Sequence, residues 1–82
     1  MSEREDAAHV HELDVTVWVG KRGIEAVTDE LEAQLDNEAA VKVKFLRSSR
    51  ARADTESLAD ELAAAVGATV TDVRGHTAVI TA

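Results

Sequence analysis

The fold is decided by the stretch VTVWVGKRGIEAV, which covers residues 15–27. Valine alternates with other residues over 15–19, and this period of two predicts a half-buried strand. A Gly-Lys-Arg-Gly segment interrupts it at residues 20–23. From Ile24 to Leu35 the large apolar residues recur at helical spacing, which predicts an amphipathic helix with its acidic residues on the other face. The stretch therefore predicts a strand and a helix joined by a short basic loop.

The same reasoning extends outward from this unit. Residues 41–46 alternate again, which predicts a second strand with Lys42 and Lys44 on one face. Residues 48–53 have no period and are expected to form a loop. A second helix is expected to begin at Asp54 or Thr55, either of which can cap it, and to stop at Gly67. Two Thr- and Val-rich strands, 69–73 and 77–81, flank a turn at residues 75–76.

The predicted order is β-α-β-α-β-β. Strands joined through a helix tend to be parallel, and a short turn joins an antiparallel pair. We therefore expect a four-stranded mixed sheet with both helices on one face. The 82 residues are expected to form a single domain, residues 1–82. Its N-terminal segment, residues 1–10, is expected to be either a short helix, because Ser2 and Glu5 have capping-box spacing, or a frayed end.

Composition excludes several classes of protein. The chain has no cysteine, so disulfides, thiolate catalysis and cysteine metal sites are excluded. No apolar run is long enough to span a bilayer and no signal peptide opens the chain, so we expect a cytoplasmic protein with no membrane partner. An acidic, lysine-poor chain rich in alanine and valine is typical of a cytoplasm at molar salt, which favours a halophilic protein over an ordinary acidic one.

The distribution of charge is more informative than the net charge of -7. That net charge by itself argues against a nucleic-acid partner, because phosphates would be repelled. The basic residues, however, are concentrated in short segments: Lys21 and Arg22; Lys42, Lys44, Arg47, Arg50 and Arg52; and Arg74 near the end. Residues 24–38 carry six acids and no base. The local pattern thus provides anion-binding segments within an acidic protein.

These segments resemble a known family, the YhbY/CRM RNA-binding domain. The Gly20–Gly23 loop looks like its GxxG loop, and His11-Glu12-Leu13 resembles the His-x-Leu ahead of its first strand. Residues 41–44 resemble its second strand, residues 58–68 its second helix with a Gly-Ala exit, and residues 73–77 its last hairpin. The N-terminal region departs from the family, which usually has a longer, basic helix there. The C-terminus also departs, because family members often end in an aromatic-Arg pair.

The resemblance implies a fold and a function. The implied fold is a two-layer α/β sandwich close to the C-terminal domain of bacterial translation initiation factor three. The implied activity is RNA binding without catalysis; bacterial stand-alone members are linked to precursors of the large ribosomal subunit, and plant multi-domain members to organellar intron splicing. We therefore expect a monomer without cofactors whose partner is RNA, either ribosomal RNA or a pre-ribosomal particle.

The candidate RNA-binding residues combine this resemblance with residue chemistry. Glycines let the backbone take φ > 0 and approach a sugar-phosphate chain, and a helix beginning near Ile24 offers free N–H groups to phosphate. Arginine suits phosphate and stacking. The expected RNA-binding residues are Gly20, Lys21, Arg22, Gly23, Lys42, Lys44, Arg47, Arg50, Arg52, Arg74 and His76.

Other interpretations remain open. Trp18 shares the alternation parity of Thr16, opposite to the valines, and either stacks on a base or packs under residues 1–13. His9 and His11 lack further ligands at sensible spacing, so no metal site is expected. The sequence contains no arrangement of a nucleophile beside a base and no carboxylate pair expected to be buried, so no enzyme is expected. The alternative function is a protein-interaction module whose acidic helix faces dock a basic protein, for example a ribosomal protein.

Overall fold

The order of elements agrees with the prediction. The computed structural model describes residues 13–51 and 53–82. The elements are β1 (Val15–Val19), the 3-10 turn η2 (Ile24–Val27), α2 (Thr28–Leu35), β2 (Ala40–Phe45), the 3-10 turn η3 (Arg47–Arg50), α3 (Thr55–Ala65), β3 (Thr69–Arg74) and β4 (Thr77–Thr81). The prediction of a helical or frayed segment at residues 1–10 lies outside the described residues.

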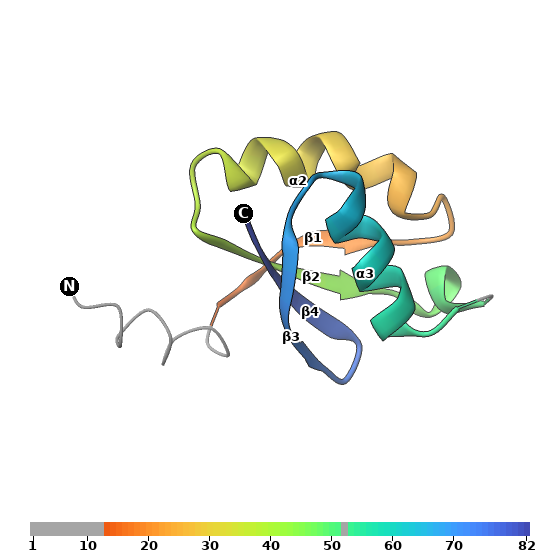
Figure 1. Cartoon of the computed structure of the whole chain (residues 1–82). Coiled ribbons are helices and arrows are strands. Elements are labelled where there is room, and N and C mark those ends of the chain that lie inside the picture. The colour runs from red at the N-terminus through yellow and green to blue at the C-terminus, as the bar shows by residue number, and fades with distance from the viewer. Residues whose placement is uncertain (1–12, 52) are drawn as a thin grey trace.

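The four strands form one mixed sheet in the order β1-β2-β4-β3. β1 pairs with β2 in parallel, and β4 pairs antiparallel with both β2 and β3. This is the expected pattern, because a helical crossover joins β1 to β2 while a tight turn joins β3 to β4. Both helices cover the same face of the sheet (Figure 1). The mixed sheet with its helices on one face is confirmed.

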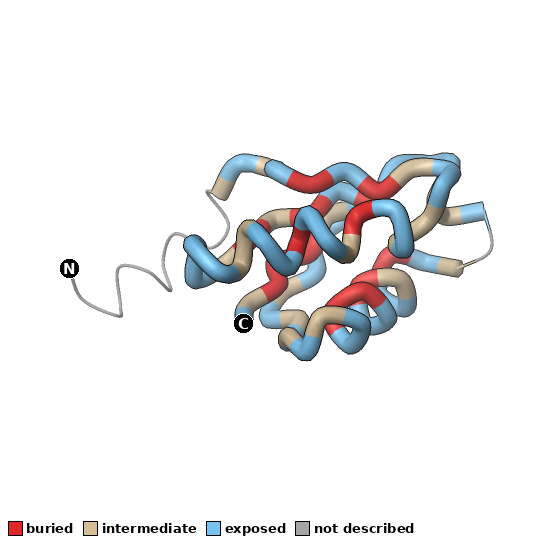
Figure 2. Tube along the Cα trace, turned by 90° about the horizontal axis from the view of Figure 1, so that it is seen from above, coloured by how far each residue is buried: buried red, intermediate tan, exposed pale blue. Residues whose placement is uncertain are grey.

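The hydrophobic core lies between the helices and the sheet. One cluster joins Val17, Val43 and Phe45 of the strands to Leu31 of α2 and Leu62 of α3. These residues recur at every second strand position and at helical spacing, and Figure 2 shows the buried positions along the strands and on the two helices. The molecule is therefore the expected two-layer α/β sandwich, and its second sheet face, opposite α2 and α3, is called the outer face below.

The first helix begins differently from the prediction. Residues 24–27 form the 3-10 turn η2, and the α-helix starts only at Thr28. In a 3-10 helix the side chains at positions i and i+3 align. Ile24 and Val27 are three apart, and both pack against the core. Their spacing therefore fits a tighter turn as well as it fits an α-helix, which is why periodicity alone did not separate the two.

Part of the expected loop at residues 48–53 is also ordered. Residues 47–50 form η3, which follows β2 after Leu46. The backbone N–H of Ser49 donates to the Leu46 carbonyl at 2.9 Å, and the Ser49 hydroxyl donates to the same oxygen at 2.7 Å. These local bonds stabilise a turn in a segment without apolar periodicity.

The ends of the second helix agree with the prediction. The Asp54 carboxylate accepts a hydrogen bond from the Ser57 N–H at 2.8 Å and so caps α3. This backbone bond, followed by the bond with the Ser57 side chain, lowers the pKa of Asp54 below its ordinary value. Gly67 ends the helix region with φ 68°, the left-handed conformation that favours glycine.

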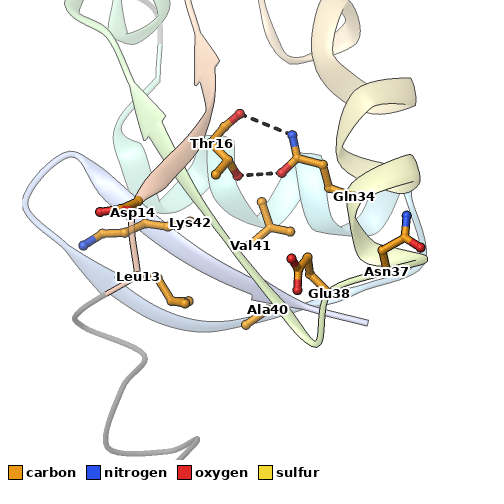
Figure 3. Close-up of a pocket in the computed structure, with 9 residues that line it drawn as sticks. All are labelled: Leu13, Asp14, Thr16, Gln34, Asn37, Glu38, Ala40, Val41 and Lys42. Carbon is orange, nitrogen blue, oxygen red and sulfur yellow. Dashed lines mark hydrogen bonds between the residues drawn. The ribbon is translucent and has the colours of Figure 1, made fainter.

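One face assignment in β1 was wrong. The pairing of β1 with β2 shifts register between Val15 and Val17, so Thr16 leaves the alternation. Its hydroxyl donates to Gln34 Oε1 of α2 at 2.5 Å, and Gln34 Nε2 donates to the Thr16 carbonyl at 3.3 Å (Figure 3). Thr16 therefore contacts the helix layer and does not share a face with Trp18. The amide of Gln34 provides a partner for this edge strand.

Candidate nucleic-acid interface

The Gly-Lys-Arg-Gly segment forms a closed turn between β1 and η2. The Gly23 N–H donates to the Gly20 carbonyl at 3.0 Å, which fixes the ends of the turn. Lys21 and Arg22 occupy its two central positions, and both are exposed. A tight turn at the end of a buried strand thus carries two adjacent positive charges into solvent.

The two glycines of this turn have different roles. Gly23 adopts φ 83° and ψ -179°, a conformation available almost only to glycine. Gly20 does not have a positive φ, so the expectation that both glycines adopt one was wrong for Gly20. A Cβ at Gly20 would meet Leu46 Cδ1 and Ser48 Oγ at 3.8 Å, which is ordinary van der Waals contact. Neither backbone geometry nor packing requires glycine at position 20.

The start of the helix contributes less to anion binding than expected. The N-cap is Gly23, which has no side chain, and the Ala26 N–H already donates to its carbonyl at 3.3 Å. Because α2 begins at Thr28, its dipole is separated from the glycine turn by η2. Glu25 adds a negative charge in the first turn. Anion contact at this turn therefore depends on the loop backbone and on Lys21 and Arg22.

Three connecting segments meet at the end of the sheet where the glycine turn lies. The Leu46 N–H donates to the Val19 carbonyl at 2.8 Å, which brings the segment after β2 beside the end of β1. The Phe45 N–H donates to the His76 carbonyl at 2.8 Å, which brings in the β3–β4 turn. We call this the loop end of the sheet. It gathers the predicted residues Gly20, Lys21, Arg22, Gly23, Arg47, Arg50 and His76.

The basic residues at the loop end are not equally available to a ligand. Arg47 is exposed, whereas Arg50 is partly buried and donates from Nε to the Phe45 carbonyl at 3.0 Å. Thr55 Oγ1 lies 3.5 Å from His76 Nδ1. Arg50 and His76 therefore also hold the local structure together, whereas the side chains of Lys21, Arg22 and Arg47 are exposed. Arg52 lies outside the described residues.

A hollow separates the glycine turn from η3. Gly20, Lys21 and Ser48 line one part of it, while Glu25 and Glu61 contribute carboxylates from the helix layer. The two carboxylates repel an anion that enters the hollow. A polyanion is therefore better accommodated along the outside of the turn, away from the helices.

The lysines of β2 are in different surroundings, although sequence alternation grouped them together. Lys44 is exposed and pairs across the sheet with Trp18, one position before the Val19–Phe45 pair at the loop end. Lys42 lies two residues further from the loop end and is only partly exposed. It lines a pocket with Asp14 and Glu38 at the opposite end of the sheet (Figure 3). The structure thus separates Lys42 from the loop-end cations.

Sequence reasoning did not identify Leu46 as a candidate site residue. Its side chain is 38% exposed, and its Cδ1 lies beside the Gly20 position. The signal was present, because Leu46 continues the alternation of Lys42 and Lys44 on one side of the strand.

Two further features concern metals and membranes. Within residues 13–51 and 53–82, no group of three or more histidine or acidic side chains is placed to hold a metal ion. His9 and His11, which were considered as ligands, lie outside this range. No helix in the same part of the chain has the length and apolar character needed to cross a bilayer.

Comparison with known proteins identifies the family. Residues 3–80 match the CRS1 / YhbY (CRM) domain. A probable RNA-binding protein of Methanocaldococcus jannaschii is 39% identical over 69 residues, which are 84% of this chain. The chain spans about half of that relative, 52% of its length. The match covers the glycine turn, both helices and the four strands as far as residue 80, so the chain belongs to the CRS1 / YhbY (CRM) domain family.

Proposed function

We propose that this protein is a non-catalytic RNA-binding protein that holds the RNA backbone at the Gly20–Gly23 turn. The observation that carries the proposal is the turn itself, an exposed Lys21-Arg22 pair beside a glycine that the fold does not require. A glycine at a position where the fold does not need one leaves room for a ligand to approach the backbone. The family supports this function, as does the name of the relative, a probable RNA-binding protein.

The proposed site uses local charge to overcome an unfavourable net charge. At -7 the whole molecule repels RNA at long range, but that repulsion is screened beyond about 10 Å at 0.1 M salt. The acidic side chains Glu25, Asp29 and Glu32 belong to the helix layer, whereas Lys21, Arg22 and Arg47 lie in the loops at one end. We propose that Arg52 and Arg74 complete this surface. Contacts of this kind position a nucleic acid without reading its sequence.

The RNA partner is proposed to be ribosomal RNA, and the task to be assembly of the large ribosomal subunit by a cytoplasmic monomer. This step rests on the family resemblance, in which bacterial stand-alone members are linked to precursors of that subunit. Competition tests it: unlabelled large-subunit RNA should displace a bound ribosomal RNA fragment more effectively than an equal mass of transfer RNA. Equal displacement by both would limit the proposal to general RNA binding.

The central experiment replaces the charges of the turn. Lys21→Ser with Arg22→Ser removes both cations but keeps both glycines and a turn-compatible sequence. Each charge-assisted hydrogen bond is worth about 1.5–3 kcal/mol, so RNA affinity should fall by about 100-fold or more in a filter-binding assay. The assay belongs at the lowest KCl concentration that keeps the protein folded, because salt compresses the difference.

A matched control separates the turn from the overall charge. Ala33→Glu with Ala64→Glu also lowers the net charge by two, at exposed positions in the last turns of α2 and α3. Glutamate is a good helix former, so the control should stay folded, and circular dichroism at the KCl concentration of the assay checks both variants. The control should bind RNA nearly as well as the parent protein. A folded serine variant that binds as tightly as the parent would contradict the proposal.

The acidic helix layer supports a second candidate function, the docking of a basic protein such as a ribosomal protein. Exposed carboxylates of α2 and α3 include Asp29, Glu32, Asp60 and Glu61. Under this alternative, the Lys21/Arg22 variant would still bind the basic partner, and Asp29→Asn with Asp60→Asn would weaken it. Binding of purified ribosomal proteins to the two variants distinguishes the two functions.

A further inference from the structure

The strand register places one row of side chains across the whole outer face of the sheet. Trp18 of β1 pairs with Lys44 of β2, Lys44 pairs with Thr77 of β4, and Thr77 pairs with Arg74 of β3. Three strand spacings of about 4.8 Å make this row about 14 Å long. The row lies at the loop end, because Trp18 is two residues before Gly20.

This row exposes an aromatic ring to solvent. Trp18 is 52% exposed, and with Leu46 and Val73 it makes up the large exposed hydrophobics of the described residues. Leu46 directly follows β2, two residues after Lys44, and its Cδ1 would touch a Cβ at Gly20 at 3.8 Å. Trp18, Lys44 and Leu46 therefore form an apolar and basic patch that continues into the glycine turn.

Charge on the outer face changes from one row to the next. The Trp18 row contains two exposed cations, Lys44 and Arg74, and no acid. The neighbouring row, further from the loop end, pairs Lys42 with Val79 and Val79 with Asp72. Val79 is buried there, although it lies on the outer face. Only the row at the loop end thus combines an exposed ring with unopposed positive charge.

We propose that Trp18, Lys44, Arg74 and Leu46 form a platform for unpaired RNA bases. A base stacks on the Trp18 ring, Leu46 contacts the next base, and the two cations bind the flanking phosphates. The proposal rests on the proposed function and adds a preference for single-stranded RNA beside the glycine turn, because a base inside a duplex cannot reach an aromatic ring on a flat sheet. The charges favour a polyanion over an apolar protein partner.

Tryptophan emission gives a direct test, because the chain has one tryptophan and no tyrosine. The full-length protein is titrated with an unstructured RNA of about ten nucleotides, within the site sizes typical of single-strand binding. Stacking of a base should quench the emission of Trp18. A duplex made from the same strand, at concentrations where filter binding shows it bound, should leave the emission nearly unchanged.

Variants of Trp18 test the affinity. Trp18→Leu keeps apolar bulk without an aromatic face and should weaken single-strand binding by about 5- to 100-fold. Trp18→Phe should recover part of the loss, because it restores a ring, and circular dichroism checks that both variants fold. Lys44→Ser with Arg74→Ser should lower affinity and reduce the slope of log affinity against log salt by about 1.4.

The outcomes separate this platform from the turn. If the Lys21/Arg22 variant binds weakly but its remaining complex still quenches Trp18, the platform is a separate contact and the proposal is supported. If wild-type protein binds RNA without quenching, or if Trp18→Leu binds as tightly as the parent, the proposal of a platform is wrong. The proposal that RNA binds at the turn is then unaffected. If the wild-type protein binds neither RNA, the proposed function and the platform both fail.

Discussion

At the scale of single residues, the two glycines of the basic turn make different demands on the protein. Gly23 needs glycine for its backbone conformation, whereas Gly20 does not. Gly23→Ala should destabilise the fold by about 1–3 kcal/mol, the usual cost of such a strained residue. Gly20→Ala should leave stability unchanged or raise it by up to about 1 kcal/mol, because alanine reduces the entropy of the unfolded chain. Urea unfolding of the two variants measures both effects.

RNA affinity should follow a different order. If a phosphate approaches the backbone at Gly20 as proposed, the methyl group of Gly20→Ala obstructs it, and the affinity for RNA should fall by about tenfold or more, the loss of one charge-assisted contact. Filter binding beside the urea data separates the two properties. A folded Gly20→Ala protein with undiminished affinity would mean that RNA does not approach the backbone at this position.

Residue-level roles were only partly predictable from sequence. The positions of Lys21 and Arg22 in a turn followed directly from the two glycines around them. The negative φ of Gly20 and the bond from Arg50 to the Phe45 carbonyl had no signal in the pattern. Periodicity reports which face of an element is apolar, but it carries no information on a specific hydrogen bond between a side chain and the backbone.

At the scale of elements, the sequence predicted the strands and both helices, because β1, β2 and the helices carry a period of two or of 3.6, while the last two strands are rich in Thr and Val around a short turn. Two departures arose where a contact between distant residues or the local backbone geometry overrides that period. Thr16 leaves the alternation of β1 and bonds to Gln34. Residues 24–27 adopt a 3-10 turn. Their apolar spacing of three suits that helix and the α-helix alike, so the sequence did not distinguish them. Such contacts depend on partners that are distant in sequence or on small differences in backbone geometry.

The cap of α3 leads to a prediction on pH. Hydrogen bonding lowers the pKa of Asp54 in the folded protein. At pH values above 3.8, the ordinary pKa that the group has in the unfolded chain, the carboxylate therefore stabilises the fold. That stability is lost as pH falls through the lower folded value. Asp54→Ala should therefore melt at a lower temperature than the parent at pH 7, and the difference should shrink below about pH 3.8.

A conservative variant controls for acid denaturation in general. Asp54→Asn keeps an acceptor for the Ser57 N–H but cannot titrate. The difference in melting temperature between Asp54→Asn and Asp54→Ala should therefore change little with pH. The difference between the parent and Asp54→Ala should change much more. A gap between the parent and Asp54→Ala that stays constant from pH 7 to pH 3 would mean that the carboxylate does not stabilise the helix through its charge.

At the scale of the whole molecule, acidic and basic residues lie on different parts of the fold. The helix layer carries acids along α2 and α3, while exposed cations occupy the loop end and the Trp18 row of the outer face. The net charge of -7 therefore conceals a polarised molecule. Such a distribution orients a polyanion toward the loop end and repels it from the helices, which makes a single binding orientation more favourable than the net charge suggests.

The same polarity predicts how the stability of the protein depends on salt. Exposed acids of η2, α2 and the segment that follows, from Glu25 to Glu38, repel one another without an intervening base in the sequence. The Debye length falls from about 10 Å at 0.1 M to about 3 Å at 1 M, so molar KCl should relieve this repulsion. The melting temperature should therefore rise between 0.1 and about 2 M KCl, as circular dichroism at several salt concentrations would measure.

A less acidic variant tests the cause of that rise. Asp29→Asn with Glu32→Gln removes two exposed charges from α2 and leaves the core residues and Gln34 in place. If repulsion within the helix layer is responsible, this variant should melt higher than the parent at 0.1 M KCl and gain less from added salt. A general effect of salt on apolar burial would instead raise both proteins equally. A melting temperature of the parent that stays flat or falls over this range would show that its acidic helix layer does not limit its stability, and the halophilic interpretation would then be wrong.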